Sequence, residues 1–324
     1  MEAAADLAAQ DSVGSPFGAT STAAEVLAGH DLTGRRVLVT GGYSGIGLPL
    51  VRALVEAGAE VLAPARRPEQ AAETLAGLPR VIVGALDLAD QASITTYVDG
   101  LVAAGGHIDV VVGNAGVMAC PEARVGPGWE RQLATNHLGH FALVNRLWPL
   151  LAGGARVVSV SSLGHHHSPM RWDDPAFDRG YDKWAAYGQS KTANILFAAH
   201  LDRHGREHGV RAWSLHPGAI LTSLGRHLTE DDLDAVLVRD ASGEPVMPDF
   251  KTPEQGAATA AWAATSPLLE DRGGAYLEDC EVGPLVTEDG LLASGVKPHA
   301  LDPEEAARLW AWSAEQTGVD ALAG

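Results

Sequence analysis

From residue 35 onward, short apolar runs alternate with longer segments in which apolar residues recur every three or four positions. Short runs bounded by glycine are typical of parallel strands that are buried on both faces. The longer segments have the period of helices that cover such a sheet. The pattern predicts strands at 36–40, 60–64, 81–85, 108–113, 156–161, 210–216 and 275–277. It predicts helices at 46–57, 69–76, 91–104, 129–151, 183–204 and 256–265.

This alternation indicates a doubly wound α/β fold, a single Rossmann-type domain with a mostly parallel sheet of about seven strands. Ligands of such a fold bind outside the carboxyl ends of the strands. The chain has 324 residues, enough for one large sheet of this kind or for two domains. We expect the catalytic domain to span residues 31–324.

The first thirty residues lie outside the alternation. They are rich in Ala, Ser, Thr and Gly. We expect residues 1–30 to form a flexible N-terminal arm, the alternative being a short helix against the body. At the other end, Asp302 is followed by a proline and two glutamates, which predicts a C-terminal helix that runs to about residue 317.

The range 223–250 also departs from the pattern, because it is rich in Asp and Glu. Leu233, Val236 and Leu237 nevertheless keep a helical spacing behind a possible cap at Thr229. A segment of this kind, inserted beyond the carboxyl end of a strand, often closes over a substrate. We therefore expect it to be a lid.

Composition narrows the possible partners. The chain carries 23 Lys and Arg against 41 Asp and Glu, a formal charge of −18. Nucleic acid and anionic membranes do not attract such a chain, so neither is expected as a partner. Cys120 and Cys280 lie far apart, which argues against a disulfide framework or a cysteine zinc site. Without a recognisable signal peptide or an apolar stretch of about 18 residues, a cytoplasmic protein is expected.

A glycine-rich loop, TGGYSGIG at residues 40–47, follows the first predicted strand and leads directly into a helix. Gly41, Gly45 and Gly47 permit a tight turn and bring the backbone close to a pyrophosphate. The N-terminus of the helix then offers unpaired N–H groups to the phosphates. A simple turn is the alternative, but the flanking strand and helix favour a dinucleotide site.

Tyr187 and Lys191 are separated by one helical turn, so their side chains leave the same face of a helix. An ammonium group beside a phenol is expected to lower the pKa of that phenol and suit it to acid–base catalysis. The alternative is a solvated pair on a helix surface. Ser162 closes the fifth predicted strand upstream of the pair.

These three segments, with three others in the same order, resemble the short-chain dehydrogenase/reductase family over about residues 32–225. The spacing G-x-x-x-G-x-G matches its cofactor loop, and the run SSLGHH at residues 161–166 is similar to the retinol dehydrogenase branch. The segments at 31–34 and 276–280 also resemble that branch and its WW-domain-containing oxidoreductase relatives. The further matching residues are Asn114, Ala115, Gly116, Asn136, Pro217, Gly218 and Thr222.

The resemblance implies an oxidoreductase that moves a hydride between a nicotinamide and a carbon that bears oxygen. Tyr187 would supply or remove the proton, and Lys191 would lower the pKa of Tyr187. Ser162 would orient the oxygen. Asn136 would fix a water that links Lys191 to solvent. The resemblance implies this cofactor-binding set: Gly41, Tyr43, Ser44, Gly45, Ile46, Gly47, Arg66, Asp87, Leu88, Asn114, Ala115, Gly116, Tyr187, Lys191, Pro217, Gly218, Ile220 and Thr222.

The residues after the second strand bear on the choice of nucleotide. NAD enzymes usually have an acid there to hold the ribose hydroxyl. This chain has Arg66 and Arg67 instead, and an arginine can pair with the 2′-phosphate of NADP. We therefore expect NADP rather than NAD, with Arg66 as the main contact; exposed loop arginines are the alternative. For Asp87 a contact with adenine and a helix cap are both open.

Three consecutive histidines, His165 to His167, suggest a metal site, but adjacent side chains on a loop rarely converge on one ion. We expect them to form the rim of the active site and expect no metal. Trp172 and Trp184 are expected to flank the substrate pocket.

The apolar residues of the helix at 183–204 suggest a homodimer or homotetramer, because in the family this helix commonly pairs with its copy. Burial within one chain is the alternative.

The expected substrate is a medium-sized, mostly apolar alcohol, ketone or aldehyde. Two other functions stay open, namely an epimerase or dehydratase that uses its nucleotide internally, and a regulator that senses NADP without turnover.

Overall fold

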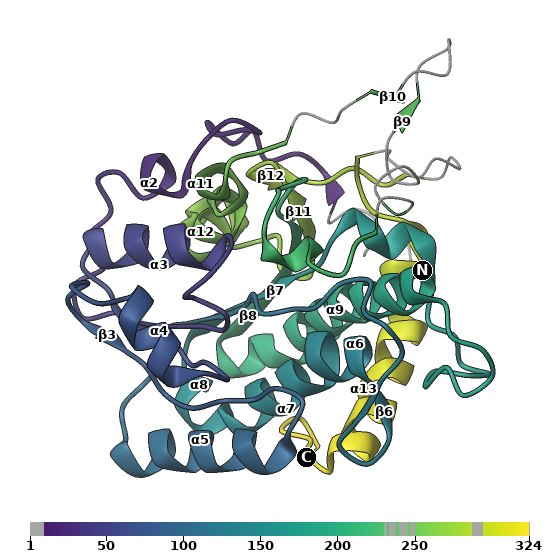
Figure 1. The fold of residues 1–324 in the computed structure, drawn as a ribbon. Coiled ribbons are helices and arrows are strands. Elements are labelled where there is room, and N and C mark those ends of the chain that lie inside the picture. The colour runs from purple at the N-terminus through teal and green to yellow at the C-terminus, as the bar shows by residue number, and fades with distance from the viewer. Residues whose placement is uncertain are drawn as a thin grey trace.

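The computed structural model describes residues 10–229, 232, 238–239, 245–246, 250–286 and 294–323. Its centre is an eight-stranded sheet with the order β12-β11-β8-β7-β4-β1-β2-β3 and with helices on both faces (Figure 1). All neighbouring strands are parallel except β11 and β12. The strands are β1 Arg36–Val39, β2 Glu60–Leu62, β3 Val81–Ile82, β4 Val110–Gly113, β7 Ala155–Val160, β8 Val210–His216, β11 Tyr276–Glu278 and β12 Glu281–Val282. The doubly wound α/β fold is confirmed.

The sheet has one strand more than expected, because the chain turns back after β11. Glu278 pairs with Glu281, so the connection has only two residues, Asp279 and Cys280. Their φ angles are 51° and 57°, and a two-residue hairpin turn of type I′ needs positive φ at both positions. The turn lacks the glycine that usually marks such hairpins, which is why the sequence pattern did not reveal β12.

The helices divide between the two faces of the sheet. Val37 and Val39 point to one face, which α2, α3 and α12 cover. Leu38 points to the other, which α5, α7 and α9 cover. The α-helices are α2 Ala23–Val26, α3 Gly47–Glu56, α4 Pro68–Thr74, α5 Gln91–Ala104, α6 Arg131–Leu133, α7 Gly139–Arg146, α8 Trp148–Leu151, α9 Lys183–Gly205, α11 Pro253–Gly256, α12 Ala258–Thr265 and α13 Pro303–Thr317.

The helix expected at 129–151 is not continuous. The segment begins as the short strand β6 (Trp129–Glu130), which pairs with β5 (Arg124–Val125). It continues through α6, a π-helical turn at Ala134–Leu138, α7 and α8. The buried carboxylate of Glu130 starts α6 by accepting hydrogen bonds from two main-chain N–H groups. The periodicity of the segment could not reveal these breaks, because the same apolar face continues through them.

The C-terminal helix α13 lies along α9 (Figure 1). The Trp310 ring stacks on Phe197 at 5.8 Å between ring centroids and meets Phe141 of α7 at 4.8 Å. The apolar residues of α9 that were considered for a partner subunit, Ile195 and Phe197 among them, are thus buried within one chain. No described helix is both long and apolar enough to cross a bilayer.

Residues 10–30, the described part of the N-terminal segment, lie against the body. The carboxylate of Glu281 accepts hydrogen bonds from the main-chain N–H groups of Val13, Gly14 and Ser15 at 2.8–3.0 Å. The short helix α2 then packs against α12. Whether the first residues are flexible stays a prediction.

Most of the expected lid lies outside the described residues, including Leu233, Val236 and Leu237. The cap expected at Thr229 is present, because its hydroxyl accepts a hydrogen bond from the N–H of Asp232 at 3.2 Å. The Asp232 carboxylate accepts in return from the N–H of Thr229 at 2.8 Å. Two short strands, Val238–Arg239 and Pro245–Val246, pair with each other further along.

Candidate active site

The glycine loop joins β1 to α3 through a turn that only glycine tolerates. Gly41 and Gly45 have φ of 65° and 52°, in the left-handed region. A Cβ on Gly47 would lie 2.4 Å from the carbonyl oxygen of Gly41. The first helical N–H groups receive no cap from the Ile46 side chain. The loop therefore leads directly into the N-terminus of α3, the end of a helix at which main-chain N–H groups can bind a pyrophosphate.

The Asn114–Gly116 segment holds this loop from the neighbouring strand. The Asn114 amide donates to the carbonyl oxygen of Thr40 at 2.8 Å, and the N–H of Ala115 donates to the Thr40 hydroxyl at 2.9 Å. A Cβ built on Gly116 would lie 3.2 Å from Asn136 Oδ1 and 3.7 Å from Lys191 Nζ. The segment therefore connects the glycine loop to two of the residues that were predicted to be catalytic.

The loop after β8 lies against the glycine loop. A Cβ on Gly45 would lie 3.7 Å from the side chain of Thr222. Ile46 and Ile220 meet over Gly256 of α11, at 2.8 Å each from a Cβ built there. The structure thus brings together segments that are more than 170 residues apart in the sequence, as the predicted cofactor site requires.

Sequence reasoning missed Lys251 beside this loop. Its main-chain N–H donates to Ala219 O at 2.9 Å, and its side chain lies over Gly218, 2.6 Å from a Cβ built there. The Lys251 ammonium pairs with Asp279 in the turn after β11. A lone lysine in a loop gave no signal that could have identified this contact.

The end of β2 places Arg66 and Arg67 in solvent, with Ala65 paired to Ala85 of the next strand. Neither guanidinium forms an ion pair with a described residue. Beyond β3, the Asp87 carboxylate accepts a hydrogen bond from Ala89 N–H at 2.9 Å. The cap of α5 is Asp90 and not Asp87. Asp87 thus shapes a turn, and its contact with adenine stays a prediction.

Ser162, Tyr187 and Lys191 form one cluster, which we call the Ser–Tyr–Lys cluster. Ser162 follows β7, and the other two lie on α9 with 4% and 5% of their surfaces exposed. Ser162 and Tyr187 are joined by a hydrogen bond. Lys191 Nζ lies 5.6 Å from the centre of the Tyr187 ring and donates to Val160 O at 2.9 Å. The alternative of a solvated pair on a helix surface is therefore wrong.

The titration of the pair differs from the expectation. Burial raises the pKa of Tyr187 to about 12, and the hydrogen bond with Ser162 opposes this shift only in part. Burial also lowers the pKa of Lys191 to about 8. The spacing argument considered the nearby charge and omitted the loss of hydration, which is the larger effect here. At neutral pH Tyr187 is a phenol, ready to donate a proton.

Asn136 lies in the π-helical turn and bonds to Val117 and Ser190. Its side-chain oxygen accepts from Val117 N–H at 2.8 Å, and its amide donates to Val117 O and to the Ser190 hydroxyl, both at 2.9 Å. Its main-chain oxygen accepts from Nδ1 of His140 at 3.0 Å. The predicted role in fixing a water stays a prediction.

His140 is a second residue that sequence reasoning missed. Its Nε2 lies 2.8 Å from the Thr40 hydroxyl, so the ring connects the Asn136 main chain to the strand before the glycine loop. Burial lowers the pKa of His140 to about 4, which keeps the ring neutral. The spacing of four residues from Asn136 was the available signal, because it places the two on one helix face.

The two tryptophans expected at the pocket have different positions. Trp184 lies 6.5 Å from Tyr187 between ring centroids, and its indole N–H donates to Asp232 at 3.3 Å. Trp172 instead packs against α13, where its indole N–H donates to Glu305 at 2.6 Å. Only Trp184 therefore lies beside the cluster and the start of the expected lid.

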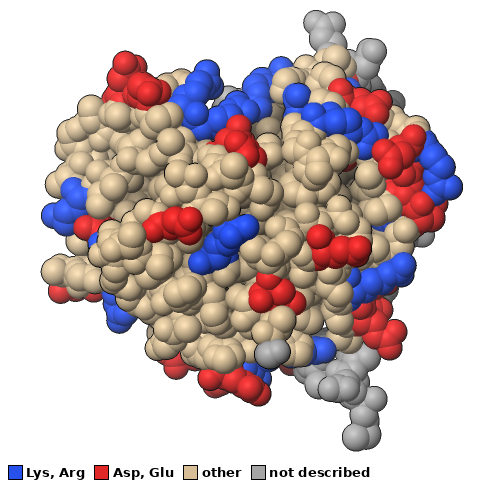
Figure 2. Space-filling model, turned by 90° about the horizontal axis from the view of Figure 1, so that it is seen from below, with Lys and Arg blue, Asp and Glu red and all other residues tan. Residues whose placement is uncertain are grey.

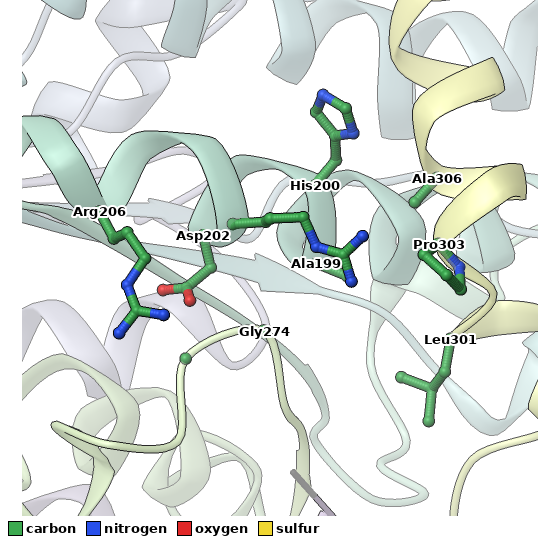
Figure 3. A pocket seen from close by; sticks show the side chains of 10 residues that line it. Ala199, His200, Asp202, Arg206, Gly274, Leu301, Pro303 and Ala306 are labelled. Atoms are coloured by element: carbon green, nitrogen blue, oxygen red, sulfur yellow. The ribbon is translucent and has the colours of Figure 1, made fainter. Parts of the chain in front are cut away.

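A surface cavity of about 120 Å³ lies elsewhere, between the end of α9, the turn at Gly274 and the start of α13 (Figure 3). Ala199, on its wall, is twelve residues beyond Tyr187, or roughly 18 Å along the helix. This cavity is separate from the Ser–Tyr–Lys cluster. On the face shown in Figure 2, acidic and basic side chains are intermixed, without a continuous basic surface.

The chain is similar to known oxidoreductases over nearly its whole length. It is 48% identical to a probable oxidoreductase of Streptomyces lividans, over 88% of this chain and 98% of that protein. It is 34% identical to human retinol dehydrogenase 14, over 88% of this chain and 87% of that one. These matches confirm the predicted likeness to the retinol dehydrogenase branch.

Solved structures with the same fold are also similar to this chain. A putative uncharacterized protein from Mycobacterium paratuberculosis has a TM-score of 0.72 at 31% identity and covers 93% of this chain and 98% of its own. RhlG of Pseudomonas aeruginosa, in an active-site complex with NADP, has a TM-score of 0.58 at 27% identity and covers 76% and 95%. Residues 35–233 match the family model described as short chain dehydrogenase. The chain therefore belongs to the short-chain dehydrogenase/reductase family and is an oxidoreductase.

Proposed function

We propose that this protein is an NADP-dependent oxidoreductase that interconverts the alcohol and carbonyl forms of medium-sized, mostly apolar compounds. The single observation that carries the proposal is the buried Ser–Tyr–Lys cluster next to the glycine loop. A hydroxyl, a phenol and an amine in one dry site can bind a carbonyl oxygen and exchange its proton. The family relationship supports a nicotinamide cofactor.

The residues around the loop fit that cofactor. The close approach of Gly41 and Gly47 leaves room for a pyrophosphate where a Cβ would collide with backbone. Exposed Arg66 suits the 2′-phosphate, and no carboxylate at the end of β2 repels it. Asp87, Asn114, Thr222 and the other predicted residues would complete the site. When bound, the nicotinamide supplies or accepts the hydride.

Each member of the cluster then has one task. Ser162 holds the substrate oxygen and stabilises the charge that develops on it. Tyr187, a phenol at neutral pH, donates its proton to that oxygen during reduction and takes it back during oxidation. Lys191, whose pKa of about 8 leaves it mostly protonated at pH 7, stabilises the phenolate that is left behind. Asn136 holds Ser190, the neighbour of Lys191, through a hydrogen bond to its hydroxyl.

Trp184 and the retinol dehydrogenase relatives favour an apolar substrate. The Trp184 ring stands beside Tyr187, and its polar edge is already bonded to Asp232. The face that remains can bury apolar surface. We further propose a cytoplasmic protein without a metal, a membrane or a nucleic-acid partner, in keeping with its acidic charge. Because α13 covers α9, a homodimer or homotetramer would have to form through another surface.

The test is the absorbance of NADPH during incubation with octanal, benzaldehyde, acetophenone and retinaldehyde. Stoichiometric loss of NADPH with at least one of them is expected, with a higher kcat/KM than NADH supports. Binding of NADPH without any net oxidation would favour an internal use of the nucleotide or a regulatory role. Failure to bind either nucleotide in a calorimeter would contradict the proposal as a whole.

A further inference from the structure

The first of the three histidines after Ser162 has no part in the chemistry above, yet both of its ring nitrogens are bonded. His165 Nδ1 lies 2.7 Å from Ser162 O, and Nε2 accepts from the Lys297 N–H at 3.1 Å. A carbonyl oxygen only accepts and an amide only donates, so the ring carries its proton on Nδ1 and is neutral. Burial holds the pKa of His165 at about 2, so the ring stays neutral over the working range.

On one side, His165 closes the turn that carries Ser162. Ser162 O also accepts from the main-chain N–H of His165 at 3.1 Å, and Ser162 Oγ accepts from Gly164 N–H at 3.0 Å. A Cβ on Gly164 would lie 2.5 Å from the Tyr187 ring. The turn therefore rests directly on the phenol, and its position sets where Ser162 Oγ lies relative to Tyr187.

On the other side, His165 reaches a segment more than 130 residues further along the chain. Residues 294–297 are anchored to β11, because the Gly295 N–H donates to the Glu278 carboxylate at 2.9 Å. His166 adds a second contact through Nε2, 3.0 Å from Gly295 O. The two histidines thus join the turn after β7 to a segment that is itself fixed to β11.

We propose that His165 is a positioning residue, whose imidazole bridges Ser162 O and Lys297 N–H and thereby holds Ser162 Oγ in place against Tyr187. The inference rests on the proposed roles of Ser162 and Tyr187. Its two bonds have different consequences. The bond to Ser162 serves turnover, whereas the bond to Lys297 serves the docking of residues 294–297.

Two substitutions separate the bonds. In His165→Asn the side-chain amide can occupy the place of Nδ1 and still donate to Ser162 O. In His165→Gln the longer side chain places its amide oxygen near the position of Nε2, where it can accept from Lys297. Exposed His208, in the 3-10 turn that follows α9, serves as a control for the His→Asn change.

We expect His165→Asn to keep kcat within about threefold of the wild type, the size of a modest hydrogen-bond change. His165→Gln should lose on the order of 10- to 100-fold, because small misplacements of reacting groups cost this much. The KM for NADPH should stay unchanged in both variants. Equal losses in the two, or losses that follow their melting temperatures, would overturn the inference.

The pH profile gives a readout that loss of stability alone does not move. The hydrogen bond with Ser162 lowers the pKa of Tyr187, so its weakening in His165→Gln should shift the rise of alcohol oxidation to higher pH. His165→Asn should keep the wild-type profile.

Amide hydrogen exchange tests for the His165 bridge without any measurement of activity. Exchange should become faster in residues 161–168 in His165→Gln and in residues 294–298 in His165→Asn. The same exchange pattern in both variants would show that no bridge exists, even for an active enzyme. If the wild-type protein does not oxidise NADPH but the two variants show these two patterns, the proposed function is contradicted and the bridge is kept.

Discussion

The two ends of the predicted cofactor crevice differ in their exposure to solvent. At one end, Tyr187 and Lys191 are buried and Ser162 is half-buried, and Ser162 Oγ and Lys191 Nζ have hydrogen-bond partners in the chain. At the other end, Arg66 and Arg67 extend into solvent at the end of β2, without an ion pair to any described residue. Burial changes the pKa values of Tyr187 and Lys191, whereas exposure leaves the two arginines able to pair with an anion.

The comparison teaches where single substitutions matter. In the buried cluster, water cannot replace a hydrogen bond that is lost with an oxygen atom. There is also no space for an added methyl group. At the exposed end, water replaces a lost side chain, so only its pairing with the nucleotide is affected. The chemistry should therefore be sensitive to substitution, whereas the choice of nucleotide should be adjustable.

The largest effect is expected for Tyr187→Phe, which removes the proton donor and keeps the ring. Turnover should fall on the order of 10²-fold or more, as for other general acids. Affinity for NADPH, measured by calorimetry, should remain. Tyr97→Phe, the same change on α5, controls for the loss of a tyrosine hydroxyl as such. Wild-type turnover by Tyr187→Phe would exclude the phenol from the reaction.

The second expectation concerns Gly47→Ala. Its Cβ would lie 2.4 Å from the Gly41 carbonyl oxygen, so the loop would have to open. We expect the affinity for NADPH to fall on the order of tenfold or more, because main-chain contacts with the phosphates depend on this turn. Gly100→Ala is the matched control, since nothing lies within 4 Å of its Cβ in α5. The control should bind normally and melt slightly higher. Equal binding by both variants would contradict the placement of the pyrophosphate.

The third expectation is a pH dependence. Tyr187 has a pKa of about 12, so the phenolate that alcohol oxidation needs becomes more abundant with every unit of pH up to that value. The rate of oxidation should rise through pH 10 without a plateau. Carbonyl reduction should change little between pH 6 and 7 and decline above pH 8, where Lys191 loses the proton with which it stabilises the phenolate. A plateau of oxidation near pH 8 would indicate instead that Lys191 lowers the pKa of the phenol, as the sequence had suggested.

The smallest effect is expected for Arg66→Ala at the exposed end. The Kd for NADPH should rise about tenfold, the worth of one charge-assisted pair to a phosphate, while the Kd for NADH stays constant. Arg67→Ala should have a smaller effect on either nucleotide. If Arg66→Ala weakened both equally, the arginine would be acting on something other than the 2′-phosphate.

Local patterns in the sequence were sufficient for much of this molecule. The alternation of apolar runs and helical segments determined the doubly wound fold, because strand and helix periods are properties of neighbouring residues. The order of the motifs identified the glycine loop, Tyr187 and Lys191 for the same reason. Even the cap at Thr229 was visible, since a capping box spans only four positions.

The rest depended on contacts between distant segments. The pKa of Tyr187 rises because the folded chain removes water from the ring, and no spacing in the sequence reports burial. α13 covers α9, and His165 meets Lys297, only because the sheet brings these segments to the same place. Short-range patterns select the elements and their chemistry, whereas packing across the chain decides hydration and therefore the direction in which that chemistry works.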